Sequence, residues 1–286
     1  MKSLLLITSS LVLVGSAQAA DLATRPYTKA PVATVIPFSW TGCHVGGHVG
    51  GAWSGTDFTD PEIATGFPGF TVSTTGASLG SNIRLDSNAG AIGGVQAGCD
   101  YQFSNNWVIG LAGDFSGADL RSMANDPFFN GKNGTPATLS SRTEWLASIT
   151  GRVGYTWDHL MLYGKGGAGF ARDNYSLNNF VTIAGLNCTT ANLITFVPCN
   201  SSTATDRVGW VAGVGLEWAF APNWSFLVEY DHYGFDSKRV GFVSPAFPSF
   251  FNPAGSTALI DIRQDVNIVK LGVNYRFGEL PVLAKY

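Results

Sequence analysis

Charged residues are scarce in this sequence. Asp, Glu, Lys and Arg make up 13% of the 286 residues, whereas ordinary soluble domains contain ~25%. The formal net charge is -3, so positive charge is not in excess. Because proteins that bind nucleic acid carry a basic surface that matches the phosphates, we expect no nucleic-acid partner.

Long apolar runs are also missing. After the N-terminal segment, no apolar stretch reaches the ~20 residues of a membrane-spanning helix. The N-terminus itself contains Lys2, the apolar stretch 4–14 and then Ala17-Gln18-Ala19-Ala20. These are the three parts of a secretory signal peptide, and the apolar part is too short for an anchoring helix. We predict a signal peptide over residues 1–19 and export to a compartment where disulfides form.

Linear motifs of catalysis and metal binding are lacking as well. The sequence has no Gly-x-Ser-x-Gly elbow, and its G-x-G-x-x-G match at 164–169 lies in an alternating segment with no helix after it. His44 and His48 share one face of a predicted strand, but no Cys or carboxylate pattern nearby supplies a strong zinc motif. We therefore expect no catalytic, cofactor or metal site and no enzyme activity. An outer-membrane hydrolase with residues scattered over strand ends remains an open alternative.

What the sequence does contain is apolar and polar residues in strict alternation. The clearest segments are 91–115 and 208–233, each interrupted by a short turn at Ser104-Asn105-Asn106 or Ala221-Pro222-Asn223. Period two is the period of a β-strand, so each segment is predicted to be a hairpin with one apolar face. The strands exceed the usual length in soluble sandwiches. They also reach the ~9–11 residues that cross a bilayer as a tilted strand.

The same alternation predicts further strands that begin near Trp40, Glu144, Leu160 and Arg263. Three short turns alternate with four long connections, at 54–88, 117–140, 173–205 and 234–262. This pattern predicts an all-β, eight-stranded antiparallel up-and-down transmembrane β-barrel over residues 40–277. Lipid offers no hydrogen-bond partner to a strand edge, so the last strand is predicted to pair with the first. Residues 20–39 are predicted to be a flexible periplasmic lead-in and residues 278–286 a C-terminal extension.

The apolar faces end in aromatic residues, as membrane-interface girdles do. The predicted outer belt consists of Trp53, Phe115, Trp145, Phe170, Trp210 and His232. The predicted periplasmic belt consists of Trp40, Tyr101, Phe103, Trp107, Trp157, Trp218, Phe220, Trp224, Tyr275 and Phe277.

Strand parity assigns six acids and five bases to the lumen. They are Asp100, Asp114, Glu144, Glu217, Glu229 and Asp231 with Arg152, Lys165, Arg207, Lys270 and Arg276. An eight-stranded barrel is only wide enough for side chains to fill, and isolated buried charges are costly unless they are paired. We predict an ion-paired plug with no stable open pore.

The four cysteines are predicted to form two disulfides. Cys43 and Cys99 lie near the periplasmic ends of neighbouring strands and share the outward parity. Opposed Cα atoms of such strands are about 4.5–5.5 Å apart, which a disulfide tolerates. The alternative is two free cysteines packed against lipid. Cys188 and Cys199 lie in one exported connection and are predicted to pair with each other.

Three motifs carry a resemblance to a known family. They are Trp40-Thr41-Gly42 followed by Val45-Gly46-Gly47, then Gly110-x-x-Gly113-Asp114-Phe115, and finally Val273-Asn274-Tyr275-Arg276-Phe277. In combination they resemble the small outer-membrane β-barrel proteins of alphaproteobacteria, which have an OmpA-like transmembrane domain. The resemblance covers residues 40–277 and implies an abundant envelope barrel, described in this family as porin-like, structural, immunogenic or, in some members, haemin-binding.

Two features depart from the family. Cys43-His44 stands where an aromatic pair is common, and nine residues follow Phe277. In the family a terminal aromatic residue is the signal read by the barrel-assembly machinery.

From these observations we predict an integral protein of the Gram-negative cell outer membrane with a structural role and surface-displayed loops. The expected partners are outer-membrane lipid, lipopolysaccharide and the barrel-assembly machinery. Phenylalanines 242, 247, 250 and 251 in the last long connection leave open a loop-mediated surface ligand. The alternatives are a narrow porin-like diffusion channel and a surface receptor or adhesin, including one for haemin.

Overall fold

The computed structural model describes residues 38–59, 82–130, 136–180, 199–243 and 257–277. Within these residues no helix is long and apolar enough to cross a membrane. The predicted signal peptide, most of the lead-in and the C-terminal extension lie outside them. The strands are β1 (Gly42–Thr59), β2 (Asn82–Asp86), β3 (Gly90–Gln102), β4 (Trp107–Asn130), β5 (Pro136–Trp157), β6 (Leu160–Phe180), β7 (Cys199–Ala221), β8 (Trp224–Val243) and β9 (Thr257–Phe277).

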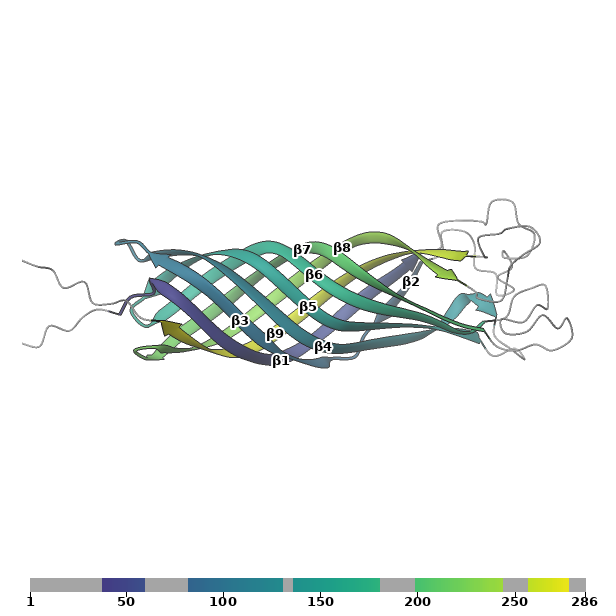
Figure 1. Cartoon of the computed structure of the whole chain (residues 1–286), viewed down its shortest axis with the longest axis horizontal. Coiled ribbons are helices and arrows are strands. Elements are labelled where there is room, and N and C mark those ends of the chain that lie inside the picture. The colour runs from purple at the N-terminus through teal and green to yellow at the C-terminus, as the bar shows by residue number, and fades with distance from the viewer. Residues whose placement is uncertain (1–37, 60–81, 131–135, 181–198, 244–256, 278–286) are drawn as a thin grey trace, which may run out of the picture. The chain divides into compact units, whose positions relative to one another are not determined.

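The strands form one closed antiparallel sheet in which neighbours along the chain are neighbours in space (Figure 1). β9 pairs with β1 from Cys43↔Phe277 to Thr59↔Asp261, which closes the ring and confirms the predicted contact of the last strand with the first. β1 pairs first with β3 and then, further along, with β2. β2 and β3 therefore form one barrel strand with an interruption at residues 87–89, and the nine segments make the predicted eight-stranded barrel.

Tight turns join β3 to β4, β5 to β6 and β7 to β8, where the sequence predicts them. Asn106 and Asp158 in the first two turns have positive φ angles of 67° and 57°. This left-handed region is open to Asn and Asp more readily than to other residues with a side chain. The local sequence thus explains why the chain can reverse so sharply at these points.

The outward face of the strands is apolar and accessible, as a lipid-facing surface requires. Val49, Leu111 and Ile149 are 64%, 71% and 64% exposed, while the alternate residues His48 and Thr150 are buried. The alternation that predicts the strands therefore separates a lipid face from a lumen face.

The strands run much further than predicted on the side of the long connections. β4 continues to Asn130 and β5 begins at Pro136, so most of the connection predicted at 117–140 is strand. In this extension Leu139 and Leu177 point inward and are fully buried, while Ser140 and Ser176 lie on the other face. The exterior is polar here because it meets water. Serines at the outward positions remove the apolar alternation, so the sequence of this segment is typical of a loop.

Candidate functional site in the barrel lumen

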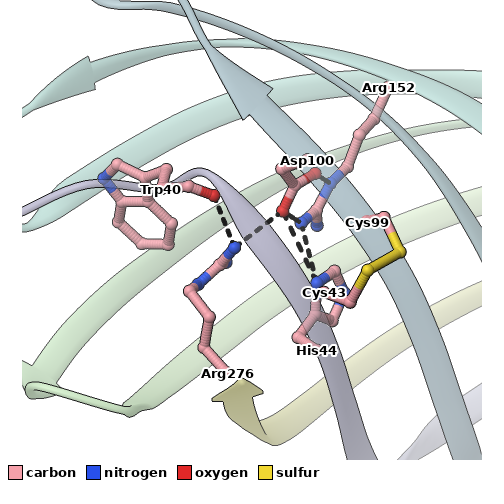
Figure 2. Close-up of a disulfide and its surroundings, with 7 residues drawn as sticks. All are labelled: Trp40, Cys43, His44, Cys99, Asp100, Arg152 and Arg276. Carbon is pink, nitrogen blue, oxygen red and sulfur yellow. Dashed lines mark hydrogen bonds and ion pairs between the residues drawn. A yellow bond between two sulfur atoms is a disulfide. The ribbon is translucent and has the colours of Figure 1, made fainter. Parts of the chain in front are cut away.

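The layer of charged residues nearest the periplasmic end surrounds Asp100 of β3 (Figure 2). The carboxylate accepts two hydrogen bonds from Arg152 of β5, the one from Nε at 2.6 Å, and one from Nη1 of Arg276 at 3.1 Å. The Nδ1 atom of His44 lies 3.5 Å away. Arg152 also donates to Glu217 of β7 at 3.3 Å. Two acids thus face two arginines, and all four side chains are at most 5% exposed.

A second charged layer lies one step further along the strands. The Nζ atoms of Lys165 and Lys270 lie 2.6 and 2.8 Å from the same oxygen of Glu229. Each lysine is also 3.0 Å from Asp231 and 3.5 Å from Asp114. Three buried acids therefore share two lysines in this layer.

The space between the two charged layers is nearly full. A cavity there, bordered by His44, Asp114, Arg152 and Lys270 among others, has about 20 Å³ accessible to water. This is room for about one water molecule. The ion pairs at this level therefore stand in a tightly packed part of the interior.

Above the charged layers the lumen becomes apolar. Side chains from all eight barrel strands form this apolar layer: Ala52, Ile92, Leu120, Leu146, Ala171, Val211, Tyr233, Phe235, Val266 and Ile268. A second apolar cluster fills the extension beyond it: Phe58, Leu85, Leu139, Tyr175, Leu177, Val240, Ile260 and Ile262. Strand alternation alone implies a polar lumen, so neither apolar cluster is expected from the sequence.

A small polar group separates the two apolar clusters. Thr143 donates to Asp173 at 2.6 Å, Gln264 donates to Thr143 at 3.0 Å, and Tyr175 donates to Asp173 at 3.3 Å. Arg207 donates to the Tyr175 hydroxyl at 2.8 Å and lies in this group rather than in a charged layer. Asp173 is absent from the predicted lumen set because its segment reads as a connection.

Strand β9 passes all of these levels on its inward face. From the periplasmic end its buried side chains include Arg276 and Lys270 in the charged layers, Ile268 in the apolar layer, Gln264 in the polar group and Ile260 in the last cluster. The lumen is thus a stack of layers with different chemistry.

Glu144 does not lie in the lumen, which corrects one of the predicted positions. The β5–β6 register shifts between Thr143 and Trp145, so a β-bulge at Glu144 reverses the parity. Its carboxylate lies outside, where Asn174 donates to it at 2.5 Å and Arg172 is 3.6 Å away. The structure places the other ten predicted charges inside, and each is at most 6% exposed.

Trp40 is not part of the periplasmic belt either, because it is fully buried inside the mouth of the barrel. Its indole N–H donates to the carbonyl of Asp158 at 3.1 Å, and its own carbonyl accepts from Arg276 at 2.6 Å. The Arg276 guanidinium lies 5.1 Å from the ring, and Phe38 packs edge-on at 5.1 Å. Strand parity does not govern Trp40 because β1 begins only at Gly42.

Cys43 and Cys99 are joined by a disulfide with an S–S distance of 2.06 Å, as predicted (Figure 2). The two residues are directly opposed in the β1–β3 ladder and lie on the outward face. Cys188 lies outside the described residues, and with it the predicted Cys188–Cys199 pair.

His44 and His48 face the lumen as polar residues. The ring of His48 makes hydrogen bonds of 3.0 Å with Gln96 and 2.7 Å with Ser116. Among the described residues no three His, Cys, Asp or Glu side chains are grouped to hold a metal ion.

The chain is similar in sequence to known outer-membrane proteins. Residues 5–277 match the model of the outer membrane protein beta-barrel domain. The 31 kDa outer-membrane immunogenic protein of Brucella melitensis is 28% identical over 97% of this chain and 100% of its own length. The 25 kDa outer-membrane immunogenic protein of Brucella canis is 25% identical over 97% of this chain and 99% of its own.

Two solved structures are more distantly similar. The outer membrane protein OprG of Pseudomonas aeruginosa matches with a TM-score of 0.40 and 10% identity, over 82% of this chain and 97% of OprG. The outer membrane protease OmpT of Escherichia coli matches with a TM-score of 0.40 and 11% identity, over 85% of this chain and 99% of OmpT. At TM-scores this low, neither protein bears on what this chain binds or cleaves.

Proposed function

This chain belongs to the family of outer-membrane β-barrel proteins, and within that family we propose that it is a sealed structural barrel that carries surface-exposed loops. It is a protein of the cell outer membrane, like the Brucella relatives. Their name, immunogenic, describes those proteins, and it supports the proposal that the connections of this chain also face the outside.

The observation that carries the proposal is the layered filling of the lumen. An ion that moves along the axis would have to separate the pairs around Asp100 and Glu229 and then enter an apolar layer around Leu146 and Ile268. Moving an ion from water into such surroundings costs several kcal/mol even after relaxation. Narrow apolar constrictions also exclude water, which is how some channels close.

Single-channel recording tests the sealed barrel. Protein is refolded, its folded state is checked by the mobility of an unboiled sample on a gel, and it is then inserted into planar bilayers. We expect no reproducible conductance steps above those of protein-free bilayers. Large steps of uniform size from the folded protein would contradict the proposal and favour the narrow diffusion channel.

We also propose that the protein is not an enzyme. The lumen acids that could act as general acids or bases are engaged in ion pairs, and the surrounding space has little room for a substrate. A hydrolase screen of the refolded barrel tests this, and turnover that disappears on boiling would contradict it.

The proposed partners are the lipid and lipopolysaccharide of the outer membrane and the barrel-assembly machinery. A receptor or adhesin role, including haemin binding, would reside in the long connections. Phenylalanines 247, 250 and 251 of the last connection lie outside the described residues. Binding assays directed at the loops separate this alternative from the structural role.

A further inference from the structure

The strand extension on the side of the long connections has a hollow bordered mostly by polar residues. The hollow measures about 850 Å³ and is bordered by residues from β4 to β7, with Asp86 and Asn88 at one side. We call six of its outward-facing residues the polar collar: Arg121, Ser140, Arg142, Asn174, Ser176 and Ser202. The residues that border the hollow include no aromatic side chain.

The collar is arranged in two rows across the strands. Ser140, Ser176 and Ser202 are opposed in the ladders of β5, β6 and β7 and form a row of hydroxyl groups. Arg121 and Arg142 are opposed in the ladder of β4 and β5 and form the start of the next row. Two guanidinium groups therefore lie beside three hydroxyls on one continuous surface.

Asp119 binds the Nε atoms of the two arginines and leaves their terminal nitrogens available. One oxygen of Asp119 accepts from Nε of Arg121 at 2.8 Å and from Nε of Arg142 at 2.9 Å. Among the described residues the terminal nitrogens of both guanidinium groups have no hydrogen-bond partner. The side chains of Arg121 and Arg142 are 65% and 48% exposed, and together with Asp119 these three side chains carry a net charge of +1.

The neighbouring carboxylates have partners of their own. Asp86, which borders the hollow, accepts from Nε of Arg84 at 3.0 Å. Glu144 accepts from Asn174 and lies 3.6 Å from Arg172, which in turn is 3.5 Å from Asp206. These acids therefore do not take up the terminal nitrogens of Arg121 and Arg142.

The height of the collar indicates what it meets. Arg142 lies three residues beyond Trp145, whose ring is 5.7 Å from that of Phe115 at the outer belt. At ~3.3 Å per residue and a tilt of ~40°, this places the guanidinium groups roughly 8 Å above the belt. Headgroups of the outer leaflet, rather than acyl chains, occupy that height.

We propose that the polar collar binds a phosphorylated saccharide headgroup. The terminal nitrogens of Arg121 and Arg142 bind the phosphate, because a guanidinium fork matches phosphate oxygens with two parallel bonds. The row formed by Ser140, Ser176 and Ser202 binds sugar hydroxyls. The inference rests on the lipopolysaccharide partner proposed above, for which it names the binding site and the ligand chemistry, and it does not depend on whether the lumen conducts.

The test compares folded wild-type protein with the double variant R121Q/R142Q and with R239Q as a matched control. Arg239 is another exposed arginine of the extension, and it donates to Asp261 through Nε and a terminal nitrogen. Intact lipopolysaccharide is titrated against each protein in detergent. We expect R121Q/R142Q to bind at least about tenfold more weakly and R239Q to stay within about twofold, since each charge-assisted bond contributes about one decade or more.

Two further probes identify the ligand chemistry and its source. Dephosphorylated lipopolysaccharide should bind wild-type protein and R121Q/R142Q equally weakly. The second probe is the delipidated phosphorylated oligosaccharide, which distinguishes a membrane glycolipid from a soluble glycan as the natural ligand. Weak binding of this probe assigns the site to the membrane. Undiminished binding that still depends on Arg121 and Arg142 assigns the site to free glycans. Equal affinity of wild-type protein and R121Q/R142Q for intact lipopolysaccharide, or an equal loss in R239Q, would overturn the proposal.

Discussion

Replacing Asp100 by Asn tests whether the charged layer nearest the periplasm depends on its balance of charge. The substitution keeps the shape of the side chain but leaves Arg152 and Arg276 with Glu217 as the remaining acid. A buried guanidinium without its own counter-charge is unfavourable in a packed interior. We therefore expect Asp100→Asn to destabilise the folded barrel strongly.

The size of the effect follows from the contacts. At an effective dielectric constant of ~20, two unit charges ~4 Å apart attract by about 4 kcal/mol. Asp100 contacts two arginines, so about 8 kcal/mol of attraction is lost. The loss is offset by several kcal/mol because a carboxylate no longer has to be buried. The expected decrease in the free energy of unfolding is about 3–5 kcal/mol, the usual range for breaking a buried pair.

Asp231→Asn in the second charged layer is the matched control. Three acids share two lysines there, and neither oxygen of Asp231 makes a well-directed hydrogen bond although each lies 3.0 Å from a lysine. The substitution leaves Asp114 and Glu229 with Lys165 and Lys270, so the layer becomes balanced. Because it also removes repulsion between acids, we expect a change below about 1 kcal/mol.

Urea unfolding of both variants in lipid vesicles measures the difference. Tryptophan fluorescence follows the transition, and the gel mobility of unboiled samples reports the folded fraction independently. If Asp100→Asn and Asp231→Asn lower the stability by the same amount, or if Asp100→Asn changes it by less than about 1 kcal/mol, charge balance does not control the stability of the lumen.

Three further predictions concern other parts of the barrel. The double variant Cys43→Ala/Cys99→Ala removes the disulfide and should lower the free energy of unfolding by up to about 4 kcal/mol, because the bond closes a loop of 56 residues. Mass spectrometry of unreduced, alkylated wild-type protein checks that the bond is present, since Cys43 and Cys99 should then be unlabelled. Gly94→Ala should cost at least about 1–3 kcal/mol, because its Cβ would lie 2.0 Å from a backbone carbonyl oxygen of β4. Gly151→Ala, whose Cβ would meet nothing within 4 Å, should change stability by less than about 0.5 kcal/mol in the same urea titration. Trp40→Ala should cost about 3–5 kcal/mol, since it empties a fully buried site at the periplasmic mouth, and an unchanged urea midpoint would show that Trp40 does not contribute to stability.

Much of the barrel can be predicted from the sequence because lipid imposes a simple rule. Outward positions must be apolar over the whole membrane, so alternation identifies the strands, their faces and the opposed positions of Cys43 and Cys99. The same rule assigns Asp100, Glu229 and Lys270 to the interior before any contact is known. The need to pair both edges then predicts the contact between the first and last strands.

The rule fails where its conditions end. Beyond the outer belt the exterior meets water, so outward serines and inward leucines such as Leu139 replace the membrane pattern, and the segment reads as a connection. At Glu144 a single β-bulge reverses which residues face the lumen, and the local sequence does not predict this bulge. Trp40 precedes the first strand, so its position depends on Arg276 and Asp158, which are distant in sequence.

The sequence by itself thus determined the kind of barrel, the faces of its strands and the residues available to the lumen. Only the tertiary structure decided which of those residues contact one another. Arg207, for example, lies in the polar group with Tyr175, whereas Arg152 and Lys270 lie in the charged layers. Parity is a property of one strand, whereas a layer takes side chains from several strands. Their relative heights follow from the stagger with which the barrel closes, and that stagger is a property of the whole sheet.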